Sequence, residues 1–407
     1  MNINQNNFIS HKKYLFIALL LIVLRFFCNI RFSFVVPYLS AVDDMQTLDK
    51  LADYWMFVLL AGFICGAYIL GKIAENRGIF LLANVTSISV ALSCLLMYFL
   101  GTKEQYISNF SLLLMIRFLN AFFQPAALIV PTIVFMKVFE NKQNIKICSY
   151  FIFASLIGMQ ASYFTVTYIS AGNLILWCKI FLIISAMILI YHLTVNPPIK
   201  KLDRIFSNQN IKKQSFTAII LAFLIGSVFI SSIRYHYFFV DTYLTDFLVT
   251  KDNPSLGYVF FYGALNLSLL IAANTFKQEN IFKLLSWSLI GILLIAITPV
   301  ILTLDSLYAN ITFQVIFAIF VAVFLSSSLA AIYTLFQDNR PIYNCVMWFS
   351  SGYAIGNFAS DWLVDLYGFF SHTNFLPMIP LLISGFVTLA ILTSSNIKTQ
   401  FVCGREV

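Results

Sequence analysis

The sequence predicts an all-α, polytopic membrane protein, and its composition and the lengths of its apolar runs support this. Of the 407 residues 60% are hydrophobic and only 10% are charged, and apolar runs of 18 or more residues recur along the whole chain. So few charges cannot cover the surface of a soluble protein. An apolar run of this length crosses about 30 Å of hydrocarbon as a helix.

Twelve apolar runs separated by polar breaks predict twelve transmembrane helices. They cover residues 14–39, 54–74, 79–100, 110–138, 146–169, 173–194, 216–245, 255–275, 281–304, 309–336, 342–367 and 374–395. The first run is longer than the core of a signal peptide and contains Arg25, so we expect it to remain in the protein as a span.

The distribution of basic residues predicts the orientation of these helices. Seventeen lysines and arginines fall on the side of the two termini, against three on the other side. Basic loops face the cytoplasm, which places both termini there. This asymmetry accounts for the net charge of +8 without any nucleic-acid partner.

A basic loop divides the chain into two halves. Residues 195–215 contain Pro197-Pro198 and five lysines or arginines, and they predict a cytoplasmic linker. We therefore expect six-helix bundles over residues 1–194 and 216–407. Two bundles of three-plus-three helices are a common transporter plan, with the substrate site between them at the midplane.

The loops and cysteines give no sign of catalytic or metal chemistry. No loop is long enough for a soluble catalytic domain, so we expect no enzyme activity. The seven cysteines form no CxxC pair, and the four histidines lack metal-ligand spacing. We expect no cofactor and no structural disulfide.

A short polar segment joins the second and third runs. Residues Gly71 to Gly78 read Gly-Lys-Ile-Ala-Glu-Asn-Arg-Gly, and we interpret them as a hinge that brings two spans close together at the cytoplasmic side. The eleventh run begins there with Asn339-Arg340-Pro341, an N-cap followed by a first-turn proline. Glu75 docked on that positive helix start would hold the cytoplasmic side shut, and Arg340 would strengthen the contact. The gate residues are then Gly71, Glu75, Arg77, Gly78 and Arg340; the alternative is a solvated loop acid.

The twelve runs, the central loop and this hinge together resemble the major facilitator superfamily. Its pattern Gly-x-x-x-Asp-Arg-x-Gly is matched by Gly71, Glu75 and Gly78, with Glu for Asp; Asn76 replaces the arginine, and Arg77 follows it. In the fourth run, Arg117-Phe-Leu-Asn120-Ala121 is similar to the pattern Arg-x-x-Gln-Gly. The resemblance implies a transporter working by alternating access, as a monomer, in the cytoplasmic (inner) membrane of a bacterium.

A narrower resemblance concerns the segment from Arg117 to Lys146. This segment is similar to bacterial proton symporters of metabolites and osmolytes and to amino-acid carriers of intravacuolar bacteria. The fifth run lacks the Gly-Pro-x-x-Gly-Gly pattern of drug antiporters, which favours uptake. The resemblance therefore implies import by proton symport; an exporter of drugs or a secreted metabolite is the alternative within the same fold, and a membrane enzyme or a channel lies outside it.

Polar side chains inside the spans are candidate site residues, because an ionised group in hydrocarbon must face a cavity or a partner. The resemblance places spans one, four, seven and ten around the cavity. Guanidinium groups suit a carboxylate, so we expect an amino acid or similar zwitterion as substrate. The candidate substrate-binding residues are Arg25, Asn29, Asn120, Gln124, Gln160, Arg234, Tyr237, Asn266 and Trp348.

Coupling to a proton needs a group that gains and loses one. Asp361 and Asp241 are the carboxylates well inside the runs, and His236 is the other candidate. We assign coupling to Asp361 together with Arg117. The expected partners are therefore a small-molecule substrate, the coupling proton and the lipid bilayer.

Small residues at close-packing spacing mark two helix faces. Gly62 and Gly66 in the second run, and Gly352 and Gly356 in the eleventh, are each four residues apart. The resemblance implies that these faces form the contact between the two halves. Packing within one half is the alternative.

Overall fold

Every complete element in the described part of the protein is an α-helix. The computed structural model describes residues 45–77, 216–239, 256–277, 280–301, 306–335, 341–369 and 378–394, and isolated residues within 111–125, 145–160 and 183–190. The helices are α3 (Met45–Arg77), α8 (Phe216–Phe239), α10 (Leu256–Thr275), α11 (Ile281–Ile301), α12 (Leu307–Leu335), α13 (Pro341–Phe369) and α14 (Ile379–Thr393).

These helices coincide with predicted spans. Helix α3 corresponds to the second span, and α8 and α10 to α14 correspond to the seventh to twelfth. The isolated helical residues within 111–125, 145–160 and 183–190 fall inside the fourth, fifth and sixth spans, whereas the first and third lie outside the described residues. By length and apolar composition, the segments Tyr54–Arg77, Phe216–His236, Ile281–Pro299 and Leu307–Tyr333 can cross a membrane. The protein is therefore a helical membrane protein.

The prediction of a loop directly after residue 74 is wrong. Helix α3 continues to Arg77, so residues 75–77 extend the predicted second span as helix, and the segment Gly71 to Arg77 forms the last two turns of α3. Lysine, alanine and glutamate are good helix formers, and a basic residue in the last turn is favourable near the negative end of the helix dipole. Gly78 lies outside the described residues.

Prolines mark two helix starts. Helix α13 begins at Pro341, as the sequence predicts. Helix α14 follows the N-cap Met378, with proline in its first turn. Proline suits these positions because the first N–H groups of a helix have no intrahelical partner.

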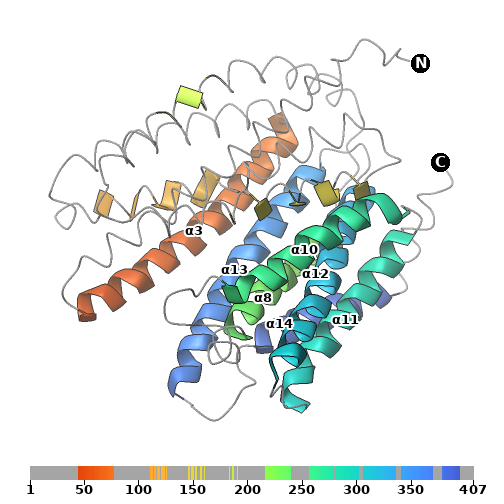
Figure 1. The fold of residues 1–407 in the computed structure, drawn as a ribbon. Coiled ribbons are helices and arrows are strands. Elements are labelled where there is room, and N and C mark those ends of the chain that lie inside the picture. Colours follow the sequence, from red (N-terminus) through yellow and green to blue (C-terminus); the bar gives the residue numbers. More distant parts are fainter. Residues whose placement is uncertain are drawn as a thin grey trace, which may run out of the picture.

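Helix α13 is the central contact of the described bundle. It packs mainly against α8 and α3, while α12 packs against α10 and α11, and α14 packs against α8 (Figure 1). The largest fully buried side chains are Phe239, Phe261, Phe317 and Phe324, from α8, α10 and α12. Several buried serine hydroxyls donate to their own helices; Ser326 Oγ, for example, donates to Ala322 O at 2.9 Å. This satisfies polar groups where no water is present.

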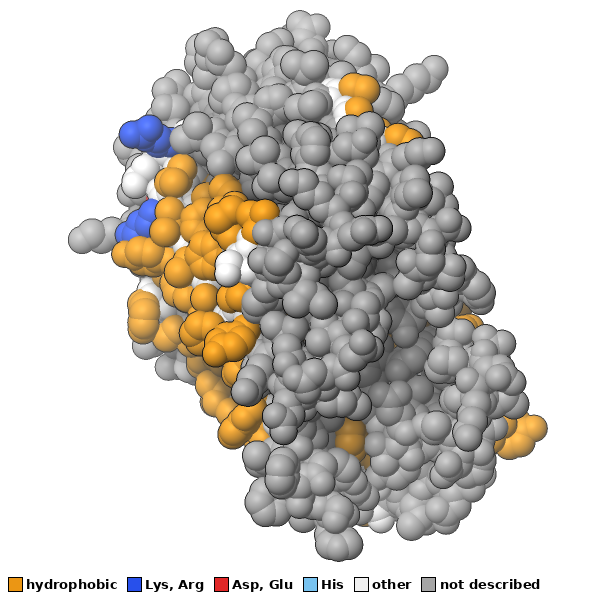
Figure 2. Space-filling model, turned by 90° about the vertical axis from the view of Figure 1, so that its left-hand side faces the viewer, with side chains coloured by type: hydrophobic (Ala, Val, Ile, Leu, Met, Phe, Trp, Pro, Cys, Tyr) orange, Lys and Arg blue, Asp and Glu red, His pale blue; other side chains and the backbone are white. Residues whose placement is uncertain are grey.

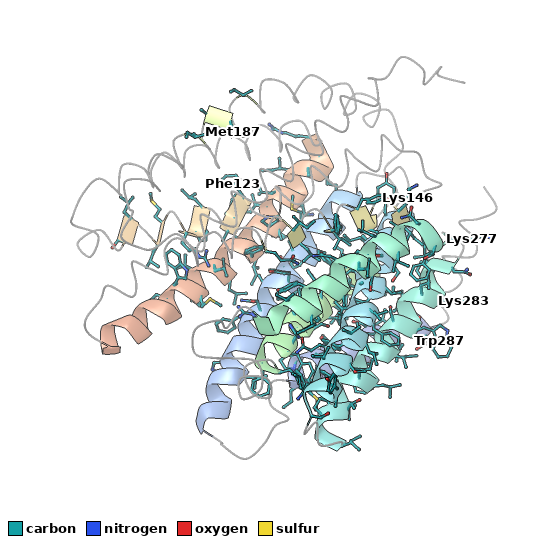
Figure 3. The ribbon with its side chains drawn as sticks, viewed as in Figure 1. Phe123, Lys146, Met187, Lys277, Lys283 and Trp287 are labelled. Atoms are coloured by element: carbon teal, nitrogen blue, oxygen red, sulfur yellow. The ribbon has the colours of Figure 1, made fainter. Side chains whose placement is uncertain are left out.

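The outward-facing side chains suit a lipid environment. Among large hydrophobic residues, Tyr308 is 83% exposed, Phe216 74% and Trp287 69%. Figure 2 shows one such face, on which hydrophobic side chains cover most of the described surface and basic ones lie at its upper edge. In Figure 3, Lys146, Lys277 and Lys283 lie near the same end of the bundle, the end assigned to the cytoplasm by the sequence.

The prediction that the glycine faces join the two halves is wrong. A Cβ on Gly66 would collide with the backbone of Phe122, and one on Gly352 would collide with the carbonyl of Phe223. Gly62 faces Ala121 and Phe118, and Gly356 faces Ile230 and Ser227. Each pair therefore packs against a segment of its own predicted half. Glycine is needed there because two helix backbones approach too closely for a side chain.

Candidate functional site

Helices α8 and α13 carry the central residues of the candidate site, Arg234 and Asn357. The two helices run parallel and in step, since Gly352 meets Phe223 and Gly356 meets Ser227 and Ile230 further along both helices. The next polar contact in this direction joins Arg234 of α8 to Asn357 of α13. Arg234 Nε donates to Asn357 Oδ1 at 2.7 Å, and Asn357 is only 9% exposed. The close packing of the α8 and α13 backbones is thus followed, one turn further along, by the guanidinium of Arg234 and its hydrogen bond to Asn357.

Asp361 occupies the same region of α13. It follows Asn357 by four residues within the helix, which is about one turn along the same face. Because α8 and α13 advance in step, this position is level with the turn of α8 that carries Arg234. The side chain of Asp361 lies outside the described residues.

An aromatic cluster covers the outer part of α8. The ring of His236, which is buried, stacks on Phe261 of α10 at a centroid distance of 3.7 Å. Phe239 lies 4.3 Å from Phe313 of α12, and Tyr235 contacts Phe317 edge-on at 5.8 Å. Residues 313–317 of α12 are therefore level with residues 235–239 of α8.

Arg117, predicted to act in proton coupling, is buried against an aromatic ring. Its Cζ atom lies 4.6 Å from the ring centroid of Trp55 in α3, and the residue is only 8% exposed. A desolvated guanidinium over an indole face is a strong cation–π arrangement. Its role in coupling stays a prediction.

Two amide residues predicted to bind substrate bind each other. Asn266 Nδ2 of α10 donates to Gln160 Oε1 at 3.0 Å. The remaining amide atoms, Gln160 Nε2 and Asn266 Oδ1, are buried without a hydrogen-bond partner among the described residues. Tyr150 and Asn274 make a second contact, at 3.5 Å, between the same two predicted spans. This pair therefore bridges the fifth and eighth spans.

Helix α3 meets α13 through a small apolar cluster. Phe63, Ala121 and Ala354 are buried together, and Ser351 Oγ donates to Phe63 O at 3.4 Å. In Figure 1 the two helices lie close at the end of α3 that carries Arg77 and diverge toward the other end. Together with the amide pair, this contact joins the two predicted halves.

The gate residues are only partly described. Gly71 is buried, Glu75 half-buried and Arg77 exposed at the end of α3, and no ion pair to Glu75 is found within the described ranges. Trp348 is half-buried on α13. Of the other predicted site residues, Arg25, Asn29, Asn120, Gln124, Gly78 and Arg340 lie outside the described residues, as do the side chains of Tyr237 and Asp361. In the described part of the chain, no cluster of histidine, cysteine or acidic residues could hold a metal ion.

Two residues of this region were missed by the site prediction. They are Trp55 under Arg117 and the fully buried Gln314 of α12. Gln314 follows Asn310 by one turn in a helix that is otherwise almost wholly apolar. That spacing was the available signal, because two amides on one face of a span need a reason to be there.

Comparison with known proteins identifies the fold. No protein-family model matches the sequence, and no curated protein matches it closely. The structure is similar to that of the proton:xylose symporter XylE of the major facilitator superfamily, with a TM-score of 0.69, 10% identity, and coverage of 94% of this chain and 95% of that one. It is also similar to the human organic anion transporter MFSD10 (TETRAN), with a TM-score of 0.63, 10% identity, and coverage of 97% and 99%.

Proposed function

We propose that this chain, which has the major facilitator fold, is a secondary active transporter that imports a small polar metabolite with a carboxylate, an amino acid or similar zwitterion. The observation that carries the proposal is Arg234, a half-buried guanidinium held by Asn357 between apolar helices. One structural neighbour is a proton:xylose symporter and another is an organic anion transporter. Both support the proposal that this chain transports a small polar solute.

Arg234 is the group best suited to the substrate carboxylate. A guanidinium fork matches a carboxylate with two parallel hydrogen bonds, and a low-dielectric setting strengthens them. The bond from Nε to Asn357 fixes the plane of the fork before substrate arrives. Such pre-organisation reduces the entropy lost on binding.

Asp361 is the proposed proton-coupling group. In this proposal the guanidinium of Arg234 binds two anions in turn, the Asp361 carboxylate and the substrate carboxylate. Protonation of Asp361 would remove the competing anion, so proton and substrate would bind together. Arg117, held on Trp55, is a second cation of the proposed coupling system.

The amide pair is a proposed substrate-responsive bridge. Gln160 and Asn266 each keep one buried amide atom without a partner among the residues described, one a donor and one an acceptor. A zwitterion that offers both kinds of group would compete for these atoms and loosen the contact between the fifth and eighth spans. Binding would then be linked to movement of one half against the other.

The cytoplasmic gate completes the proposed cycle. Glu75 lies half-buried two residues before the end of α3, and α13 begins at Pro341. With both termini in the cytoplasm of a bacterium, the close ends of α3 and α13 would be the cytoplasmic side. The conformation is then closed to the cytoplasm, and Glu75 with Arg340 would hold it so.

Transport by reconstituted protein tests this proposal. Purified protein in proteoliposomes, given individual radiolabelled L-amino acids, should accumulate at least one of them only while an inward proton gradient is present. Arg234→Gln should abolish this uptake. Lys283→Gln, at an exposed basic residue of α11, is the matched control and should retain it.

Two other results are informative. Accumulation that occurs only in oppositely oriented vesicles would favour the alternative, a proton-coupled exporter. Absence of uptake of every amino acid in either orientation, or full uptake by Arg234→Gln, would contradict the proposed substrate class and site.

A further inference from the structure

Gln314 of α12 is a buried amide whose hydrogen bonds are not made by any of the described residues. The residue is 0% exposed, and neither its amide nitrogen nor its amide oxygen has a hydrogen-bond partner among the described residues. Leaving a buried donor and acceptor unpaired is strongly unfavourable. An apolar side chain of the same size would be more stable at this position.

The buried serines of α12 are satisfied within the helix. Ser326, Ser327 and Ser328 each donate to a backbone carbonyl three or four residues earlier, at 2.9, 2.7 and 3.0 Å. A short hydroxyl reaches the preceding turn, whereas a glutamine side chain extends away from its own backbone. The amide of Gln314 therefore lacks the local backbone partner that these serine hydroxyls have.

The position of Gln314 is fixed by the aromatic cluster. Its neighbour Phe313 contacts Phe239, and Phe317 contacts Phe261 at a centroid distance of 6.2 Å. Gln314 is thus level with residues 235–239 of α8, directly beyond Arg234 along that helix. The contacts described between α12 and its neighbours at this level are ring contacts, which can separate without breaking a hydrogen bond.

We propose that Gln314 is a specificity-determining residue that binds an uncharged polar group of the substrate, a hydroxyl or a carboxamide. This inference rests on the proposed function, in which Arg234 binds the carboxylate of the same substrate. A glutamine amide both donates and accepts, as do a hydroxyl and a carboxamide. Substrates without such a group leave the amide unpaired, so the site selects against them.

Two measurements on purified protein test this role. In the absence of ligand, Gln314→Met should melt at the same temperature as wild type or higher, because methionine fills similar space without unmet hydrogen bonds. In thermal-shift titrations, the variant should bind L-serine and L-glutamine about tenfold more weakly than wild type does, the effect of one lost hydrogen bond, and L-leucine within about twofold. Ile316→Met, the same replacement at a lipid-facing residue of α12 that is 41% exposed, should leave both readouts unchanged.

The possible failures are distinguishable. A lower melting temperature for ligand-free Gln314→Met would show that the amide is structural and would overturn the proposal. Equal weakening, or no weakening, for all three amino acids would overturn selection by Gln314 while leaving the transport proposal intact. No shift of wild type with any amino acid would contradict the proposed substrate class itself, and Gln314 would then have no such substrate to select.

Discussion

Two arginines inside the bundle are held in different ways, and the difference indicates different roles. Arg117 lies over the ring of Trp55 and is 8% exposed, so its charge is held by an aromatic face within the packing of α3. Arg234 is half-buried, and its Nε donates to Asn357 Oδ1 rather than lying against an indole face. The partial exposure of Arg234 leaves it better placed to meet a substrate than the enclosed Arg117. We therefore propose the substrate role for Arg234.

The coupling role of Asp361 gives a prediction at the scale of one residue. Asp361→Asn keeps the shape and polarity of the side chain but cannot release a proton. In proteoliposomes, the variant should exchange labelled for unlabelled substrate at close to the wild-type rate, yet fail to accumulate it against a gradient. Asp365→Asn, one turn nearer the helix end, should behave as wild type. Accumulation by Asp361→Asn would remove this residue from the mechanism.

At the scale of helices, glycines show where backbones touch. A Cβ added to Gly352 of α13 would collide with the backbone of Phe223, whereas one added to Gly263 of α10 would meet nothing within 4 Å. The same substitution therefore has opposite expected effects at two helical positions. Only the first is required for packing.

This contrast can be measured by thermal unfolding in detergent. Gly352→Ala should lower the free energy of unfolding by about 1–3 kcal/mol, as overpacking does. Gly263→Ala should leave it unchanged or raise it by up to about 1 kcal/mol, because alanine is the better helix former. A Gly352→Ala variant as stable as wild type would contradict the close packing of α8 against α13.

The helices were predictable from sequence, but their partners were not. Apolar runs located α8 and α10 to α14 within a few residues, because lipid imposes length and composition on a span. The extension of α3 from Glu75 to Arg77 was missed, since polar residues in the last turn of a helix resemble a loop. The contact between Arg234 and Asn357 joins residues 123 positions apart, and no periodicity predicts which faces meet. Gln314 was missed for the same reason: its burial depends on the packing of neighbouring helices.

At the scale of the whole molecule, the packing of α3 against α13 is the main described contact between the two predicted halves. Hydrogen bonds between the halves also link Gln160 with Asn266, Tyr150 with Asn274, and Ser351 with Phe63. Ala67, Leu70 and Ala74 of α3 belong to the same hydrophobic cluster as the core of α8, α10 and α12. An interface between two packed bodies can exist in two arrangements that differ little in free energy. The divergence of α3 from α13 in Figure 1 fits one of those arrangements.

The distance between the diverging ends of α3 and α13 tests alternating access most directly. Tyr54 and Trp362 are 59% and 56% exposed. Spin labels on Tyr54→Cys and Trp362→Cys, in a background without other cysteines, report this distance by pulsed electron paramagnetic resonance. A pair of labels on one helix, Trp287→Cys and Leu294→Cys of α11, is the control for distance changes caused by motion of the labels rather than of the helices. Alternating access predicts two distance populations whose ratio changes when the transported amino acid is added, while the α11 distance stays constant. A single distance that is unaffected by substrate and by a proton gradient would contradict it.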